Sequence, residues 1–208
     1  MSEWDCIVRI FLFGGRSSGA EAYLGGDGGG VDIGGIVVRF ALGVESFYLP
    51  NTREGPGYSA IRVYDGKRYR IENEVFNTDY EDFSTILYMK IRESDVIMFC
   101  YSITSRSSFE DLARYHADAI RGKDSDSFPM LLVATTCDEE EKREVSTSEG
   151  EKLAESWGCP FFEVSAKTNL RVEDVFHQAV LEWLRFKDPS SLPLSNDNEA
   201  KKRKCILM

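Results

Sequence analysis

The sequence lacks most features that mark secreted, membrane-spanning or nucleic-acid-binding proteins. Its five cysteines are scattered, odd in number and without metal-ligand spacing, which predicts no disulfide framework and favours a reducing compartment. No apolar run approaches a transmembrane helix in length, and the acidic N-terminus has no signal-peptide core. The net charge of −10 argues against nucleic acid as a partner. A length of 208 residues suits one domain with a short extension.

Positive charge is outnumbered along most of the chain, with 25 Lys and Arg against 35 Asp and Glu. One unbroken basic block stands near the C-terminal end: Lys201, Lys202, Arg203 and Lys204. It contributes +4, so the other residues carry a net charge of −14. Residues 187–200 are rich in Pro, Ser, Asn and Asp, which predicts a flexible linker. We therefore expect a domain over residues 1–187 and a tail over residues 188–208.

Two apolar runs that end in polar residues organise the chain. Residues 130–138 begin as a fully apolar run and end in Asp138, as a buried parallel strand does when it delivers a carboxylate to its carboxyl edge. Residues 160–164 form a second such run, followed by Ser-Ala-Lys at 165–167. Ligands bind at this edge in open α/β sheets, so we expect a site where the two segments meet.

Apolar periodicity and turn signals predict the other elements. Further strands are expected at residues 7–13, 58–64, 68–76 and 96–101, with a hairpin turn at Asp-Gly 65–66. Helices are expected at residues 36–47, 83–92, 107–121, 146–157 and 172–186. This order predicts an α/β fold, namely a doubly wound, mostly parallel six-stranded sheet with one antiparallel edge strand.

Side-chain spacing adds detail to these helices. The sequence predicts two capping boxes, in each of which a serine is followed three residues later by a glutamate. They are Ser107 with Glu110 and Ser146 with Glu149. In the helix at 83–92, Ile86, Leu87 and the aliphatic stem of Lys90 are expected to face inward. The last helix carries an apolar stripe at helical spacing: Val172, Val175, Phe176, Ala179, Val180, Trp183 and Leu184.

Several segments, together with the order of elements, resemble Ras-type small GTPases, with fungal members closest. They are YSITSRSSFE at 101–110, REVSTSEG at 143–150 and FEVSAK at 162–167, and the final CILM resembles a prenylation box. The resemblance is strong over residues 95–186 and poor over the glycine-rich region 14–35. It implies a P-loop NTPase, small G-protein fold that holds GTP or GDP with Mg²⁺, through a phosphate loop, two switch loops and a guanine pocket.

The resemblance places the guanine pocket in two segments. A carboxylate pairs with the guanine N–H and amine groups, and backbone N–H groups meet the guanine oxygen. The matching residues here are Asp138, Ser165, Ala166 and Lys167. Thr135 and Thr136 replace the Asn-Lys pair that ties the loop and covers the base, so both contributions are weakened. The alternative, that Asp138 merely begins a turn after a strand, stays open.

The phosphate loop is where the chain departs furthest from the family. A working loop reads Gly-x4-Gly-Lys-Ser/Thr. The candidate glycines are Gly14, Gly15, Gly19, Gly28, Gly29 and Gly30. The motif can be aligned to this region in two registers. In the first, which starts at Gly14, Ala20 and Glu21 stand in place of the lysine and the Ser or Thr. In the second, which uses the later glycines, Ile33 and Gly34 stand at those two positions. Both registers stay open, as does the reading of residues 14–35 as a flexible insertion, and we expect weakened phosphate binding.

The switch loops retain little of the family pattern. Thr52 matches the first-switch threonine that binds Mg²⁺ and is the single, weak metal-ligand candidate. Asn77 removes the carboxylate behind Mg²⁺, Tyr80 replaces a glycine, and Glu81 replaces the glutamine that orients water. We expect no meaningful GTP hydrolysis and assign no catalytic residue, so whether the chain is an enzyme stays open.

The last residues carry the most specific motif. Cys205, fourth from the end and followed by two aliphatic residues and Met, is the expected site of farnesylation. One lipid plus a basic patch anchors stably, and residues 201–204 supply the patch. This predicts a prenyltransferase and an anionic membrane as partners, and a location on the cytoplasmic face of a membrane, the plasma membrane in particular.

Three functions remain open from the sequence. The leading one is a membrane-anchored, Ras-like guanine-nucleotide-binding signalling protein that binds weakly or does not hydrolyse, a pseudo-GTPase acting through effector or regulator proteins at its switch surface. The second is an active GTPase switch whose phosphate loop is rebuilt from the glycine-rich segment. The third is a non-functional duplicate or a mis-assembled chain.

Overall fold

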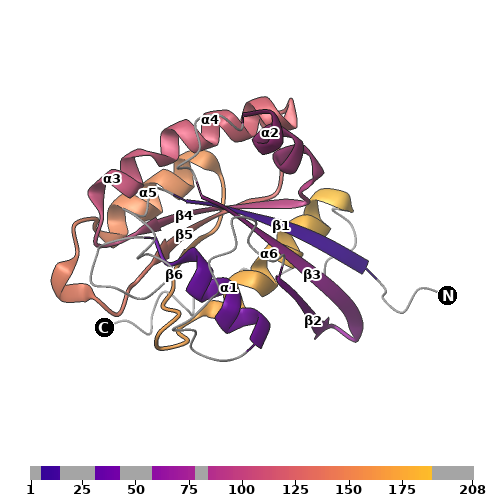
Figure 1. The fold of residues 1–208 in the computed structure, drawn as a ribbon, viewed down its shortest axis with the longest axis horizontal. Helices are drawn as coiled ribbons and strands as arrows, with labels where there is room; N and C mark the ends of the chain where they lie inside the picture. The colour runs from indigo at the N-terminus through magenta and orange to yellow at the C-terminus, as the bar shows by residue number, and fades with distance from the viewer. Residues whose placement is uncertain (1–5, 15–30, 43–57, 78–83, 189–208) are drawn as a thin grey trace.

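The computed structural model describes residues 6–14, 31–42, 58–77 and 84–188 (Figure 1). Within these residues the chain folds as one sheet covered by helices on both faces. No helix in this part of the chain combines the length and the apolar character needed to cross a membrane.

The sheet has six strands in the order β2-β3-β1-β4-β5-β6. Their bounds are β1 Cys6–Gly14, β2 Tyr58–Tyr64, β3 Lys67–Asn77, β4 Val96–Ser102, β5 Met130–Thr135 and β6 Phe161–Glu163. All neighbours are parallel except β2, which runs antiparallel to β3 at one edge. Asp65 and Gly66 join β2 to β3 with φ of 50° and 75°, the left-handed conformations of a tight hairpin turn. The predicted fold class is confirmed.

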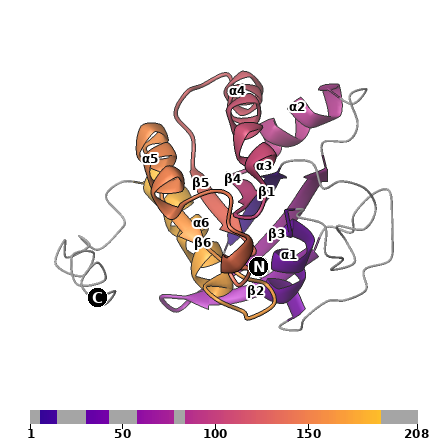
Figure 2. The same ribbon diagram turned by 90° about the vertical axis from the view of Figure 1, so that its left-hand side faces the viewer.

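The helices lie in two layers. They are α1 Ile33–Leu42, α2 Ser84–Glu93, α3 Arg106–Glu110, α4 Leu112–Lys123, α5 Thr147–Trp157 and α6 Val172–Lys187, with a short 3-10 turn, η2, at Glu140–Lys142. Helices α1 and α6 pack on one face of the sheet, and α2, α4 and α5 pack on the other (Figures 1 and 2). The carboxyl ends of the five parallel strands lie at one edge of this sheet.

Burial on both faces explains the continuous apolar runs of the strands. In β1, Val8, Ile10 and Leu12 join the core under α1 and α6, whereas Phe11 and Phe13 join the core under α2 and α4. Every residue of β4 and β5 is buried. The stripe predicted for the last helix is confirmed: six of its residues are buried in α6, and Leu184 packs against the same core.

Some local predictions were wrong. The second capping box is present, with the Ser146 N–H donating to Glu149 Oε2 at 2.9 Å. The first is displaced, because Ser105 caps α3 and its hydroxyl accepts from the Ser108 N–H at 3.3 Å. Ile86 is 46% exposed; Ile91, later on α2, supplies the fully buried contact instead.

We predict that Tyr101→Phe raises the free energy of unfolding by about 1 kcal/mol, because a buried hydroxyl without a partner loses its hydrogen bonds to water and gains none in the protein. The Tyr101 hydroxyl is buried and has no hydrogen-bond partner within the described part of the chain, and burial raises its pKa. Urea unfolding measures the effect.

Tyr64→Phe is the matched control, because the Tyr64 hydroxyl donates to Glu173 Oε1 at 2.8 Å. This variant should lose about 0.5–1.5 kcal/mol. Equal losses in the two variants would contradict the prediction.

Candidate functional site

The ends of β5 and β6 meet at the carboxyl edge of the sheet, as the sequence predicts. The Ser165 hydroxyl donates to Asp138 Oδ1 at 2.6 Å, and the Lys167 ammonium lies 3.8 Å from Oδ2 of the same carboxylate. The Asp138 side chain is only 15% exposed, whereas that of Lys167 is 71% exposed. The carboxylate is therefore held in place and retains accepting capacity beyond its bond to Ser165.

The turn after β6 presents backbone donors beside this carboxylate. A bridge between Ser165 and Leu170 closes the turn, and the Ser165 hydroxyl also accepts from the Thr168 N–H at 3.1 Å. Among the residues that the structure describes, nothing accepts a hydrogen bond from the N–H of Ala166 or Lys167. A carboxylate and two free N–H groups side by side suit a ring that carries donors and a carbonyl oxygen, as guanine does.

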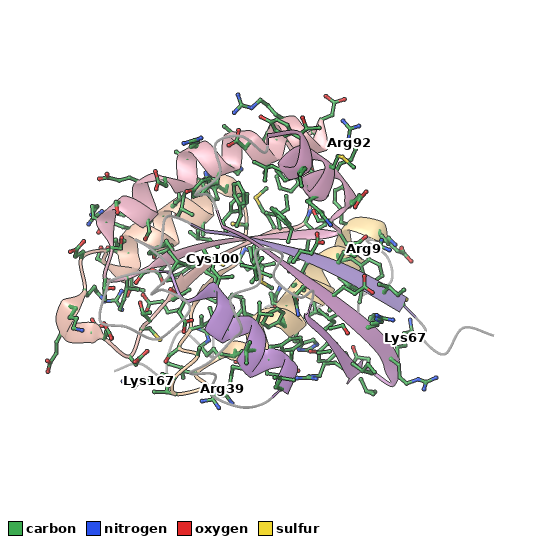
Figure 3. All side chains as sticks on the ribbon, viewed as in Figure 1. Arg9, Arg39, Lys67, Arg92, Cys100 and Lys167 are labelled. Carbon is green, nitrogen blue, oxygen red and sulfur yellow. The ribbon has the colours of Figure 1, made fainter. Side chains whose placement is uncertain are left out.

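One contact of this turn was missed from the sequence. Arg39, on α1, donates from Nε to the Ala166 carbonyl at 2.8 Å and from Nη2 to the Lys167 carbonyl at 2.9 Å. Figure 3 shows Arg39 and Lys167 at the same edge of the molecule. The only sequence signal was a lone basic residue in an apolar helix, and no local pattern points from it to the turn.

The two threonines after β5 make different contacts from the pair they replace. Thr135 is fully buried, and its hydroxyl has no partner among the described residues. Thr136 takes a left-handed φ of 59°, and its hydroxyl contacts Ser102 Oγ at 2.6 Å and the Thr135 carbonyl at 2.7 Å. Thr136 thus points back to the strand ends and cannot cover the face of a base.

The phosphate side of the site is built around Asp32. Its Oδ1 accepts from the Gly35 N–H at 2.9 Å, so this carboxylate caps the start of α1. A Cβ on Gly35 would lie 2.3 Å from that oxygen, so a larger residue there would require the Asp32 side chain to shift. Burial raises the pKa of Asp32, the Gly35 hydrogen bond lowers it, and the charge of Asp138 raises it further. The helix therefore begins at Ile33, three residues earlier than predicted.

The lysine position of the second register lies inside the core. Ile33 is 6% exposed and packs on the end of β1, where a Cβ on Gly14 would lie 2.3 Å from Ile33 Cδ1. Gly14, a predicted phosphate-loop glycine, thus has a packing role. Gly34, in the first turn of α1, has no hydroxyl for a metal.

Of the other predicted site residues, one lies in a described strand. Asn77 is the last residue of β3 and pairs in register with Gly14. The rest lie outside the described residues: Gly15, Gly19, Gly28, Gly29, Gly30, Thr52, Tyr80, Glu81, Lys201, Lys202, Arg203, Lys204 and Cys205. In the part of the chain that is described, no three His, Cys, Asp or Glu side chains are grouped to hold a metal ion.

The two halves of the site differ in how they fit a guanine nucleotide. The base half offers the Asp138 carboxylate and two N–H groups, those of Ala166 and Lys167, that have no acceptor among the described residues. The phosphate half offers a second carboxylate, Asp32, at the helix end where an anion would bind. Two like unit charges about 4 Å apart in a partly screened site repel by about 4 kcal/mol, so a phosphate group does not fit beside the Asp32 carboxylate.

Comparison with known proteins gives one family. The Ras family profile matches residues 58–185. A "Ras-like protein" of Laccaria bicolor is 39% identical over 113 residues, which are 54% of this chain and 54% of that protein. "Ras-like protein 2" of Mucor circinelloides f. lusitanicus is 42% identical over 105 residues, 50% of this chain and 53% of that protein. The chain thus matches about half the length of these relatives.

We predict that Asp32→Asn stabilises the protein at pH 7, by on the order of 1 kcal/mol. Asn caps a helix as well as Asp does and removes a partly buried charge that faces Asp138. Because the folded-state pKa is raised, the wild-type protein loses stability as the pH rises from the ordinary value of 3.8 through that pKa. Urea unfolding should show the gain at pH 7 and its loss below pH 3.8.

Asp111→Asn is the control, because Asp111 is the N-cap of α4 and its side chain makes no capping hydrogen bond. A pH-independent gain, or the same gain in both variants, would contradict the role assigned to the Asp32 charge.

Proposed function

Because this chain belongs to the Ras family, we propose that it is a Ras-like protein that recognises guanine through the base half of its site, binds the phosphates weakly and does not hydrolyse GTP. The observation that carries this proposal is the Asp32 carboxylate, which accepts from the Gly35 N–H at the start of α1. In a nucleotide-binding loop, the N–H groups at this position hold phosphate oxygens.

The base half supports binding of guanine over other bases. The Asp138 carboxylate accepts from donors, as the guanine ring N–H and amine require, and the Ala166 and Lys167 N–H groups can donate to the guanine oxygen. The Ser165 hydroxyl holds the carboxylate at 2.6 Å, which reduces the ordering cost of binding.

The phosphate half argues for a pseudo-GTPase. One charge-assisted contact to a phosphate contributes about 1.5–3 kcal/mol, so each lost contact weakens binding about 10- to 150-fold. Ile33 replaces the lysine in the second register, and its side chain is buried. By resemblance, Asn77 and Glu81 also remove the groups that hold Mg²⁺ and orient water.

The chain would then act through contacts with effector or regulator proteins in signalling. Apolar side chains are exposed on α2 and β2, beside the segments that match the switch loops. They are Ile61, Val63, Ile86 and Met89, with 49%, 61%, 46% and 56% of their surface exposed. Such residues supply the contact area that protein partners bury.

We further propose that the protein works on the cytoplasmic face of a membrane, the plasma membrane in particular. The support is the sequence of the tail, where a prenyltransferase would modify Cys205 and residues 201–204 would contact anionic lipid.

We predict that guanosine and GTP bind with affinities within about tenfold of each other, because the phosphates add little, and that EDTA changes neither affinity. Isothermal titration of the purified chain measures both. The protein as isolated should also release far less than one guanine nucleotide per chain on denaturation.

Asp138→Ala should weaken guanosine binding more than about tenfold. Glu139→Ala is its matched control, a neighbouring carboxylate that pairs with Lys142 instead. Stoichiometric GDP, with GTP bound about a thousandfold more tightly than guanosine in a Mg²⁺-dependent way, would support the active GTPase in place of the pseudo-GTPase.

We predict that Cys205→Ser moves the protein from the membrane fraction to the soluble fraction, since the lipid would supply most of the apolar attachment. Fractionation of cells that express each form measures this. Cys159→Ser is the control, because that cysteine lies in the folded domain and packs against its core. Membrane binding that persists in the Cys205 variant would contradict the anchor.

A further inference from the structure

The contact between α1 and the turn after β6 joins residues far apart in the sequence. The Arg39 guanidinium donates to two successive carbonyls, those of Ala166 and Lys167, at 2.8 and 2.9 Å. A planar guanidinium can hold two acceptors in a set geometry, which an ammonium group cannot do. The side chain therefore determines the orientation of these two peptide groups as well as their position.

The direction of the carbonyls sets the direction of the free N–H groups. In a trans peptide, the C=O of one residue and the N–H of the next point to opposite sides, so the Ala166 carbonyl fixes the Lys167 N–H and the Lys167 carbonyl fixes the Thr168 N–H. The Thr168 N–H, which belongs to the same turn, donates to the Ser165 hydroxyl, and that hydroxyl donates to Asp138. The N–H side of the turn is therefore the side of Asp138, opposite Arg39.

The helix that carries Arg39 is held at both ends. Asp32 caps its start through the Gly35 N–H. Near its end, the Phe40 ring stacks on Phe176 of α6 with centroids 3.8 Å apart. The Phe40 carbonyl also accepts from the guanidinium of Arg62 on β2. Arg39 thus reaches the turn from a backbone that is already ordered.

We propose that Arg39 is a positioning residue for guanine recognition. It holds the peptide group between Ala166 and Lys167 so that the Lys167 N–H faces the carbonyl oxygen of the base, while Asp138 separately accepts from the base donors. This inference rests on the proposed binding of guanine. It assigns Arg39 to recognition of the guanine carbonyl oxygen and Asp138 to recognition of the ring N–H and the amine. Nucleoside analogues that change one of these groups at a time can test this assignment.

The experiment measures the affinities of guanosine, 6-thioguanosine and inosine for the full chain by titration at neutral pH. 6-Thioguanosine keeps the ring N–H and the amine but replaces the oxygen with a poor acceptor, and inosine keeps the oxygen but lacks the amine. In Arg39→Gln, the preference for guanosine over 6-thioguanosine should fall about tenfold, equivalent to about 1.4 kcal/mol. The preference for guanosine over inosine should not change, because it reports Asp138.

Two further variants make the test specific. Arg39→Lys keeps one of the two bonds and should fall between wild type and Arg39→Gln. Arg114→Gln removes an exposed guanidinium from α4, on the other face of the sheet, and should match wild type.

The outcomes distinguish failure of the positioning role of Arg39 from failure of guanine binding itself. An unchanged guanosine/6-thioguanosine ratio in Arg39→Gln, or an equal fall in both ratios, would overturn the positioning role and leave guanine binding intact. If the wild-type chain shows no preference for guanosine over adenosine, the proposed function falls, and this inference falls with it.

Discussion

The start of α1 is capped by a carboxylate of the chain itself. The Asp32 carboxylate accepts from the Gly35 N–H. Ile33 then turns into the core against Gly14, which fixes where the helix begins relative to β1. The cap by Asp32 and the packing of Ile33 against Gly14 thus act together to place the start of α1.

The carboxylate of the base half is held by the sheet. Asp138 and Ser165 follow β5 and β6, two neighbouring parallel strands, and their 2.6 Å bond links the strand ends directly. Burial of β5 on both faces holds this edge in place. The base-side turn has a second support, because Arg39 on α1 donates to two of its carbonyls.

The sequence predicted the strands and the buried helix face correctly where burial determines which residues are apolar. The apolar runs predicted the strands, and the stripe of α6 predicted its buried face, because both reflect a two-sided core. The cap of α3 was placed wrongly because several serines lie within four residues, and only the folded backbone selects Ser105. The Asp32 cap was not predicted, because the glycines in the first turn of α1 have low helix propensity and moved the predicted start of the helix to a later residue. Arg39 could not be assigned, because its two acceptors lie 127 and 128 residues away.

These observations connect the two ends of α1 to different parts of the molecule. Its first turn is closed by Asp32, and its last turn holds the base-side turn through Arg39 and contacts β2 and α6 through Phe40. The Asp32 carboxylate occupies the N–H end of the helix, where the backbone N–H groups and the helix dipole favour negative charge. One short helix thus connects the cap on the phosphate side to the turn on the base side, which gives the two halves of the site a common support.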